Sequence, residues 1–186
     1  MPIPFRDADD LAELGATAYL TIRPLEEGRG FEGALFLTNA RGEPLEFTYN
    51  RVETPHSFLW RKEDIRRHAQ NRLTISLLSI CPVTPKLLLA LARETGSVLF
   101  CRDIRVSLPV CRIASTSEMV SITAGEVRET MEMADPLNLF WFPGPPPEDT
   151  TERRLLCELA NRGLLLEPFE RAQIGLDEVY KERHEA

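Results

Sequence analysis

Basic side chains gather in one short stretch of this chain, and they are its clearest candidates for binding chemistry. The stretch contains Arg61, Lys62, Arg66, Arg67 and Arg72. Cations along one face of a helix could contact a phosphate backbone or an acidic protein surface. The alternative is a solvated helix face, because apolar residues recur every four positions through the same segment. Both interpretations stay open, and these five residues are our candidate binding site.

Carboxylates are the second group whose chemistry must be weighed. A metal-dependent nuclease needs several carboxylates that converge on one point, so that bound metal ions can stabilise the attacking and leaving oxygens. In this sequence the least unfavourable set is Glu26, Glu63 and Glu94, which belong to three separate segments. Glu63 lies at the start of an expected helix, where acids often serve the helix dipole instead. We therefore name these three residues only as an alternative catalytic set.

Other catalytic patterns are missing from the sequence. The three histidines, His56, His68 and His184, form no recognisable Ser/His/Asp arrangement, and the four cysteines form no C-x-x-C or Cys/His cluster. The glycine-rich segment EEGRGFEG lacks the spacing of a phosphate-binding loop. We predict no metal site and no cofactor, and we lean against an enzyme while leaving that question open.

Composition restricts the partners. The chain has 186 residues, a formal net charge of −7 and 43% hydrophobic residues. An acidic protein of this kind does not grip nucleic acid or anionic lipid with its whole surface, although a local basic patch is compatible with these numbers. No apolar run approaches the roughly 18 residues of a membrane span, and no secretory signal pattern is seen. We expect a cytoplasmic protein without membrane contact.

Periodicity indicates the elements that must position these groups. Alternating apolar and polar residues predict a first strand over 16–25 and a β-hairpin in which 33–39 pairs antiparallel with 45–51. Apolar residues spaced by four predict a long helix over 60–80. The apolar run over 86–92 predicts an interior strand covered on both faces, with a helix as the alternative.

The flanking segments are read in the same way. Before the first strand, acids followed by Leu11, Leu14 and Gly15 predict a short N-terminal helix. After the interior strand we expect a short helix within 94–104 and a strand over 105–114, whose Pro109 implies an edge position or an irregularity. The remaining expectations are a strand or hairpin arm over 117–127, an aromatic strand over 136–142, and helices over 148–163 and 167–183.

This order of elements resembles the ribonuclease H-like fold over about residues 17–114. The fold class that we predict is α/β, with a mixed sheet in which an antiparallel three-strand meander is followed by βαβ units, plus C-terminal helices. Nucleases of that fold hold two metal ions with acids in the first strand, the long helix and the fourth strand. The segments AYLTIRPL and KLLLALAR contain no acid, so that catalytic set cannot be placed on matching positions. We expect a single domain over 1–186, with a core at 17–114 and an extension at 115–186.

The segment RGEPLEFTYN also resembles a pattern in an uncharacterised bacterial protein family, which implies no activity. Our leading functional hypothesis is a non-catalytic α/β binding or scaffold subunit of a bacterial cytoplasmic assembly. It has a protein partner, and nucleic acid is a further candidate partner through the basic helix face. The first alternative is a ribonuclease H-like metal-dependent nuclease with displaced carboxylates. The second is a small-molecule sensor domain of the PAS, GAF or roadblock type.

Overall fold

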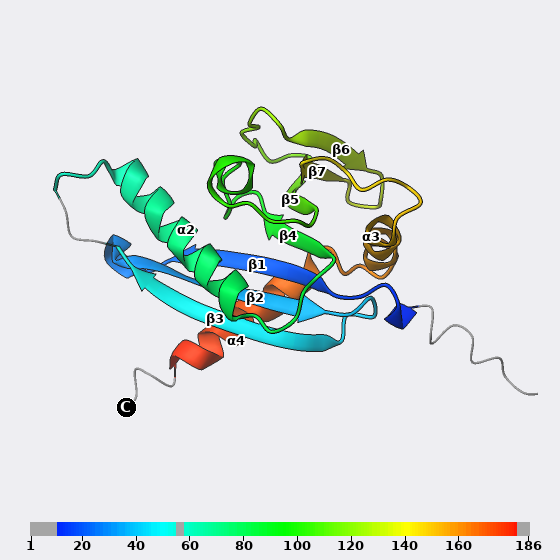
Figure 1. Cartoon of the computed structure of the whole chain (residues 1–186), viewed down its shortest axis with the longest axis horizontal. Helices are drawn as coiled ribbons and strands as arrows, with labels where there is room; N and C mark the ends of the chain where they lie inside the picture. The colour runs from blue at the N-terminus through cyan, green and yellow to red at the C-terminus, as the bar shows by residue number, and fades with distance from the viewer. Residues whose placement is uncertain (1–10, 55–57, 182–186) are drawn as a thin grey trace, which may run out of the picture.

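The computed structural model describes residues 11–54 and 58–181. Its strands form one seven-stranded mixed sheet in the order β3-β2-β1-β4-β5-β7-β6 (Figure 1). Their bounds are β1 (Thr17–Pro24), β2 (Gly30–Thr38), β3 (Pro44–Glu53), β4 (Leu87–Leu91), β5 (Val110–Ser115), β6 (Val127–Met131) and β7 (Leu137–Phe142). Within the described ranges, no helix has the length and apolar character that crossing a membrane requires.

The first three strands form the antiparallel meander that the sequence predicts. In the hairpin, Gly33 of β2 lies opposite Asn50 of β3, and Leu37 lies opposite Glu46, so the predicted pairing of 33–39 with 45–51 is confirmed. Gly42 makes the turn with a φ of +78°, a conformation that residues with a Cβ rarely adopt.

The parallel part of the sheet begins at β1. Strand β4 runs parallel to β1 on one side and to β5 on the other, and all five of its residues are buried. The prediction of an interior strand over 86–92 is therefore confirmed. Together, the meander, the parallel strands and the C-terminal helices confirm the predicted α/β fold class. The single-domain organisation stays a prediction.

Helices cover both faces of the sheet. Helix α2 (Lys62–Ile80) crosses one face, whereas α3 (Thr151–Asn161) and α4 (Glu167–Lys181) lie against the other (Figure 1). Alternate residues of β1 meet these two layers. Leu20 packs in the core layer of α2, and Tyr19 packs edge-on against Phe169 of α4. This period-two alternation is the reason why one strand can support two hydrophobic cores.

The regions around β5 differ from expectation. Strand β5 is interior, between β4 and β7. Pro109 does not prevent this, because it precedes the first residue of the strand and its carbonyl accepts a hydrogen bond from the Leu88 amide. The short helix expected within 94–104 is one π-helical turn, Leu99–Asp103. The N-terminal helix was expected over residues 6–15. Residues 6–10 lie outside the described residues, and Leu11 and Ala12 are helical.

The prediction of a strand over 117–127 is wrong up to residue 126, because pairing begins only at Val127. The backbone carbonyl of Ser121 accepts from the Arg112 side chain. It is therefore used by a side chain and not by a neighbouring strand. The sheet itself continues past residue 114 through β7, which pairs antiparallel with β5, and then β6.

Candidate functional site

The carboxyl ends of β1 and β4 meet at one edge of the sheet. The two strands are parallel, with Leu20 opposite Ala90, so the residues that follow them emerge side by side. Ligands of open α/β sheets commonly bind outside the carboxyl ends of parallel strands, where the chain connections diverge. We call this region, formed by Ile22–Pro24 and Arg93–Glu94, the carboxyl edge.

Glu94 joins three elements at the carboxyl edge. Its Oε2 accepts a hydrogen bond of 3.2 Å from the Ile22 amide of β1, and its Oε1 accepts one of 3.1 Å from the Gln173 side chain of α4. Burial raises the pKa of the Glu94 carboxyl, against the opposing effects of the Ile22 amide and the nearby Arg93 guanidinium. Glu94 is thus a fixed carboxyl group that keeps its proton to higher pH than a solvated glutamate.

A first cleft lies between the carboxyl edge and α2. It has a volume of about 290 Å³, and its polar lining consists of Arg23, Arg66, Gln70, Arg93 and Glu94. Arg66 and Gln70 are four residues apart on α2 and therefore share one helix face. Arg66 and Arg93 are exposed, and neither forms an ion pair within residues 11–54 and 58–181. The first cleft therefore presents two guanidinium groups whose charge no carboxylate there neutralises by contact.

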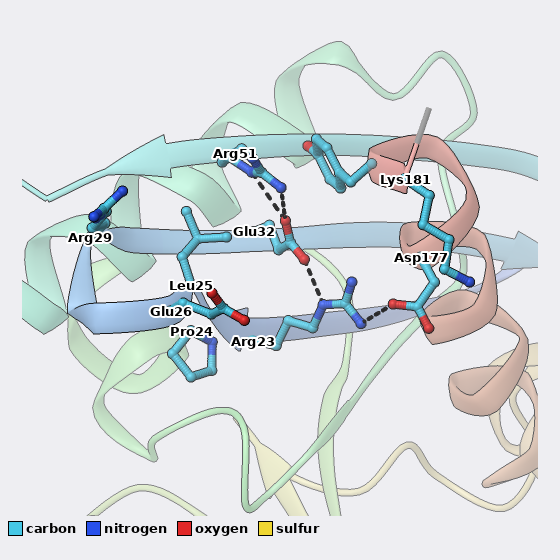
Figure 2. Close-up of a pocket in the computed structure, with 10 residues that line it drawn as sticks. Arg23, Pro24, Leu25, Glu26, Arg29, Glu32, Arg51, Asp177 and Lys181 are labelled. Carbon is cyan, nitrogen blue, oxygen red and sulfur yellow. Dashed lines mark hydrogen bonds and ion pairs between the residues drawn. The ribbon is translucent and has the colours of Figure 1, made fainter. Parts of the chain in front are cut away.

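A second cleft, of about 400 Å³, opens toward α4. Figure 2 shows the side chains of Arg51, Glu32, Arg23 and Asp177 in a row across β3, β2, β1 and α4. Glu32 accepts from Arg51 at 2.6 Å and from Arg23 at 2.7 Å, and Arg23 also donates to Asp177 at 2.8 Å. Only 5% of Glu32 is exposed. Its burial with two cationic partners makes this row a rigid floor for the cleft.

The rest of the second cleft carries further charge. The Arg51 guanidinium lies 4.1 Å above the centre of the Tyr180 ring, which restricts its orientation. Arg29 and Lys181 lie toward opposite ends of the cleft, and Glu26 lies between them (Figure 2). In all, four basic and three acidic side chains line the cleft.

The structure does not bring the alternative catalytic set together. Glu26 lines the second cleft, Glu94 lines the first, and Glu63 is exposed on the first turn of α2. In the part of the chain that the structure describes, no three His, Cys, Asp or Glu side chains are close enough to hold a metal ion. The arginines of the carboxyl edge would also repel a divalent cation. These residues do not fit the two-metal centre of ribonuclease H-like nucleases.

The basic residues of α2 point to different neighbours. Arg66 reaches the first cleft, whereas Arg72 lines a separate groove beside Asn50 and Ser76. Arg67 donates to both carboxylate oxygens of Asp103, which holds the pKa of that carboxyl below its usual range. Arg61 pairs with Asp64 at 2.9 Å, and Lys62 is exposed at the start of the helix. Of the five predicted residues, Arg66 alone lines the carboxyl-edge cleft.

Sequence reasoning missed Arg23, Arg93 and Gln173. Arg93 follows the interior strand directly, so the rule that sites form at the carboxyl ends of parallel strands could have identified it. Arg23 ends the first strand and could have been found in the same way. Gln173 lies on a helix 79 positions away from Glu94, and no local pattern indicates their contact.

No protein-family model and no curated protein sequence matches this chain. Two similar solved structures are endonuclease V enzymes. The enzyme from Streptomyces avermitilis has a TM-score of 0.59 at 14% identity, covering 98% of this chain and 96% of that chain. The enzyme from Bacillus subtilis has a TM-score of 0.57 at 14% identity, covering 93% of this chain and 85% of that chain.

These similarities correct our leading functional hypothesis. The non-catalytic scaffold hypothesis is contradicted, because the structures that share the architecture are named as nucleases and therefore favour the nuclease alternative. Similarity at 14% identity shows architecture and does not transfer an activity. The chain has the ribonuclease H-like fold that is seen in the endonuclease V structures.

Proposed function

We propose that the protein acts on nucleic acid and binds it at the carboxyl edge of β1 and β4. The observation that carries the proposal is the first cleft, where Arg66 and Arg93 come from different elements and line one cavity. Each guanidinium offers five N–H donors, and planar donors of this kind suit phosphate oxygens. The endonuclease V architecture supports nucleic acid as the source of that phosphate.

The overall charge of the protein makes the position of these arginines informative. At a net charge of −7, the molecule as a whole repels a polyanion. Binding must therefore depend on a local surface where cations outnumber acids. The first cleft meets this condition, because Arg23, Arg66 and Arg93 line it with a single carboxyl group, Glu94.

The direct test is the salt dependence of binding to a labelled 12-nucleotide single strand. The change is Arg66→Glu/Arg93→Glu, measured by fluorescence anisotropy between 50 and 200 mM salt. Each phosphate contact contributes about 0.7 to the slope of log K against log salt on a single strand. We expect the variant to bind at least about tenfold more weakly, with a slope shallower by roughly 1.4.

The matched control is Arg105→Glu/Arg154→Glu, which makes the same change in net charge. Arg105 and Arg154 are exposed, line neither cleft, and form no ion pair in the described part of the chain. The control should keep most of the affinity and the whole salt slope. Equal losses in the two double variants, or an unchanged slope in the first, would contradict the proposed binding site.

Phosphodiester cleavage is the second candidate function, favoured by the likeness to the endonuclease V structures. Glu94 is the carboxyl group inside the first cleft, so Glu94→Gln is the informative change. Under this candidate, wild-type protein with Mg²⁺ or Mn²⁺ cleaves labelled DNA or RNA, and Glu94→Gln loses at least about tenfold in rate. Glu118→Gln, outside both clefts, keeps the rate.

The assay follows product length on a denaturing gel. Absence of cleavage at every metal concentration, or equal rates for wild type and Glu94→Gln, rules out this second candidate. The binding proposal is independent of that result, because it is measured without turnover.

A further inference from the structure

The second cleft is lined by three basic residues that do not line the first cleft, Arg29, Arg51 and Lys181. We infer that the second cleft is a phosphate subsite for the same ligand, an inference that rests on the proposed function. The ligand is then a single-stranded nucleic acid that crosses the carboxyl edge from one face of the sheet to the other.

The two clefts share a wall and open on opposite faces. Both are lined by Arg23 and Pro24, the last two residues of β1. The first cleft also includes Arg66 of α2, whereas the second includes Asp177 of α4. Helices α2 and α4 cover opposite faces of the sheet (Figure 1). A chain that runs from one cleft to the other must therefore pass around the end of β1.

The basic side chains that line the second cleft outnumber the acidic ones by one, four to three. Its floor pairs Glu32 with Arg23 and Arg51, and Arg23 also donates to Asp177. These bonds use only part of the N–H donors that the two guanidiniums carry. Lys181 lies 3.8 Å from Glu178, a distance at the limit of an ion pair, and its side chain is 72% exposed. Arg29 supplies a further exposed cation at the other end of the cleft (Figure 2). Phosphate oxygens, which only accept hydrogen bonds, complement such donors.

The geometry selects a single strand over a duplex. Double-stranded DNA has a persistence length of about 150 base pairs, so it cannot turn around the end of one β-strand without a large deformation energy. A single strand is flexible and can place successive phosphates on both faces. Proteins that bind single strands typically follow the backbone with a positively charged groove.

The experiment measures the affinity of wild type and of one further double variant for three ligands. The ligands are a 4-nucleotide strand, a 12-nucleotide strand and a 12-base-pair duplex, and the variant is Arg29→Glu/Lys181→Glu. We expect wild type to bind the 12-nucleotide strand at least about tenfold more tightly than either other ligand. In the variant this advantage over the 4-nucleotide strand is lost, whereas binding of the short strand, which one cleft can hold, changes by less than about twofold.

Further measurements make the result specific. Arg29→Gln/Lys181→Gln should give an intermediate loss, since it removes charge without reversing it, and thermal unfolding confirms that both variants fold. The control Arg105→Glu/Arg154→Glu should retain the length dependence. Competition with a nucleoside monophosphate tests the other source of phosphate. If the second cleft binds the mononucleotide and contributes nothing to the strand, the inference is wrong.

The outcomes separate this inference from the proposed function. If wild type binds no strand at all, the proposed function fails. If wild type binds the 12-nucleotide strand and Arg29→Glu/Lys181→Glu binds it equally well, only the second subsite fails. If the duplex binds as tightly as the strand, the crossing of the carboxyl edge is wrong.

Discussion

Gly175 shows how a residue that is unfavourable in its own element can be required by a neighbouring one. Glycine inside a helix costs roughly 1 kcal/mol relative to alanine, and Gly175 lies inside α4. A Cβ at this position would lie 2.7 Å from Cζ of Phe47 on β3. The Phe47 ring in turn packs edge-on against Phe36 and is tilted against Tyr49. The glycine lets α4 approach the meander closely enough to form the wall of the second cleft.

We predict that Gly175→Ala destabilises the protein by about 1 kcal/mol or more, because overpacking outweighs the gain in helix propensity. In a Phe47→Leu background the same change should become neutral or stabilising by up to about 1 kcal/mol, since the ring is no longer in the way. Urea unfolding of the four proteins in this cycle measures the coupling. Destabilisation of equal size in both backgrounds would show that the Phe47 contact is not its cause.

Arg112 acts at the scale of elements, by holding an irregular segment against the sheet. From β5 it donates to both carboxylate oxygens of Glu126, at 2.7 and 2.9 Å, and to the backbone carbonyls of Thr95 and Ser121. Side-chain exposure is 4% for Arg112 and 2% for Glu126. This network connects β5, the segment after β4 and the segment before β6, and so replaces the strand pairing that residues 117–126 lack.

We predict that Arg112→Met costs about 3–5 kcal/mol of unfolding free energy, because it leaves the Glu126 carboxylate buried without its partner. The double variant Arg112→Met/Glu126→Gln should recover part of that loss, since the uncompensated charge is removed with the pair. Chemical denaturation of the two variants measures the difference. A double variant that is less stable than the single one would contradict this account of the network.

At the scale of the whole molecule, the sheet order positions the carboxyl edge. Strand β1 pairs antiparallel with β2 and parallel with β4, so its carboxyl end lies where the meander meets the parallel strands. Arg23, Arg66 and Arg93 line one cleft there, in a protein whose net charge is −7.

Much of the fold could be predicted from local patterns. The alternation around residues 33–51, the four-residue spacing in the long helix and the apolar run over 86–92 each report which faces of one element are buried. Burial of a face is a property of consecutive residues, so periodicity reveals it. The prediction for 117–126 was wrong because that segment is held by Arg112 from another strand, and no pattern within it carries that information.

The candidate site was predictable only in part. Arg66 and Glu94 were named from the sequence, and both line the first cleft. Arg23 and Arg93 were not named, and the acid-free strands led us to a scaffold hypothesis that the similarity to the endonuclease V structures contradicts. Residue types reveal which chemistries a chain can supply. Only the tertiary structure shows which of these groups lie together and which known architecture the chain shares.

The sequence by itself determined most of the elements, the acidic charge and the absence of acids from the first and fourth strands. The tertiary structure alone decided which groups meet, such as Glu94 with Gln173, and which cations are neutralised, such as Arg67 by Asp103. The physical reason is the range of the interactions along the sequence. Secondary structure follows from interactions within a few residues, whereas a binding site depends on distances between groups that are far apart in the sequence, and these are set by how the sheet and helices pack.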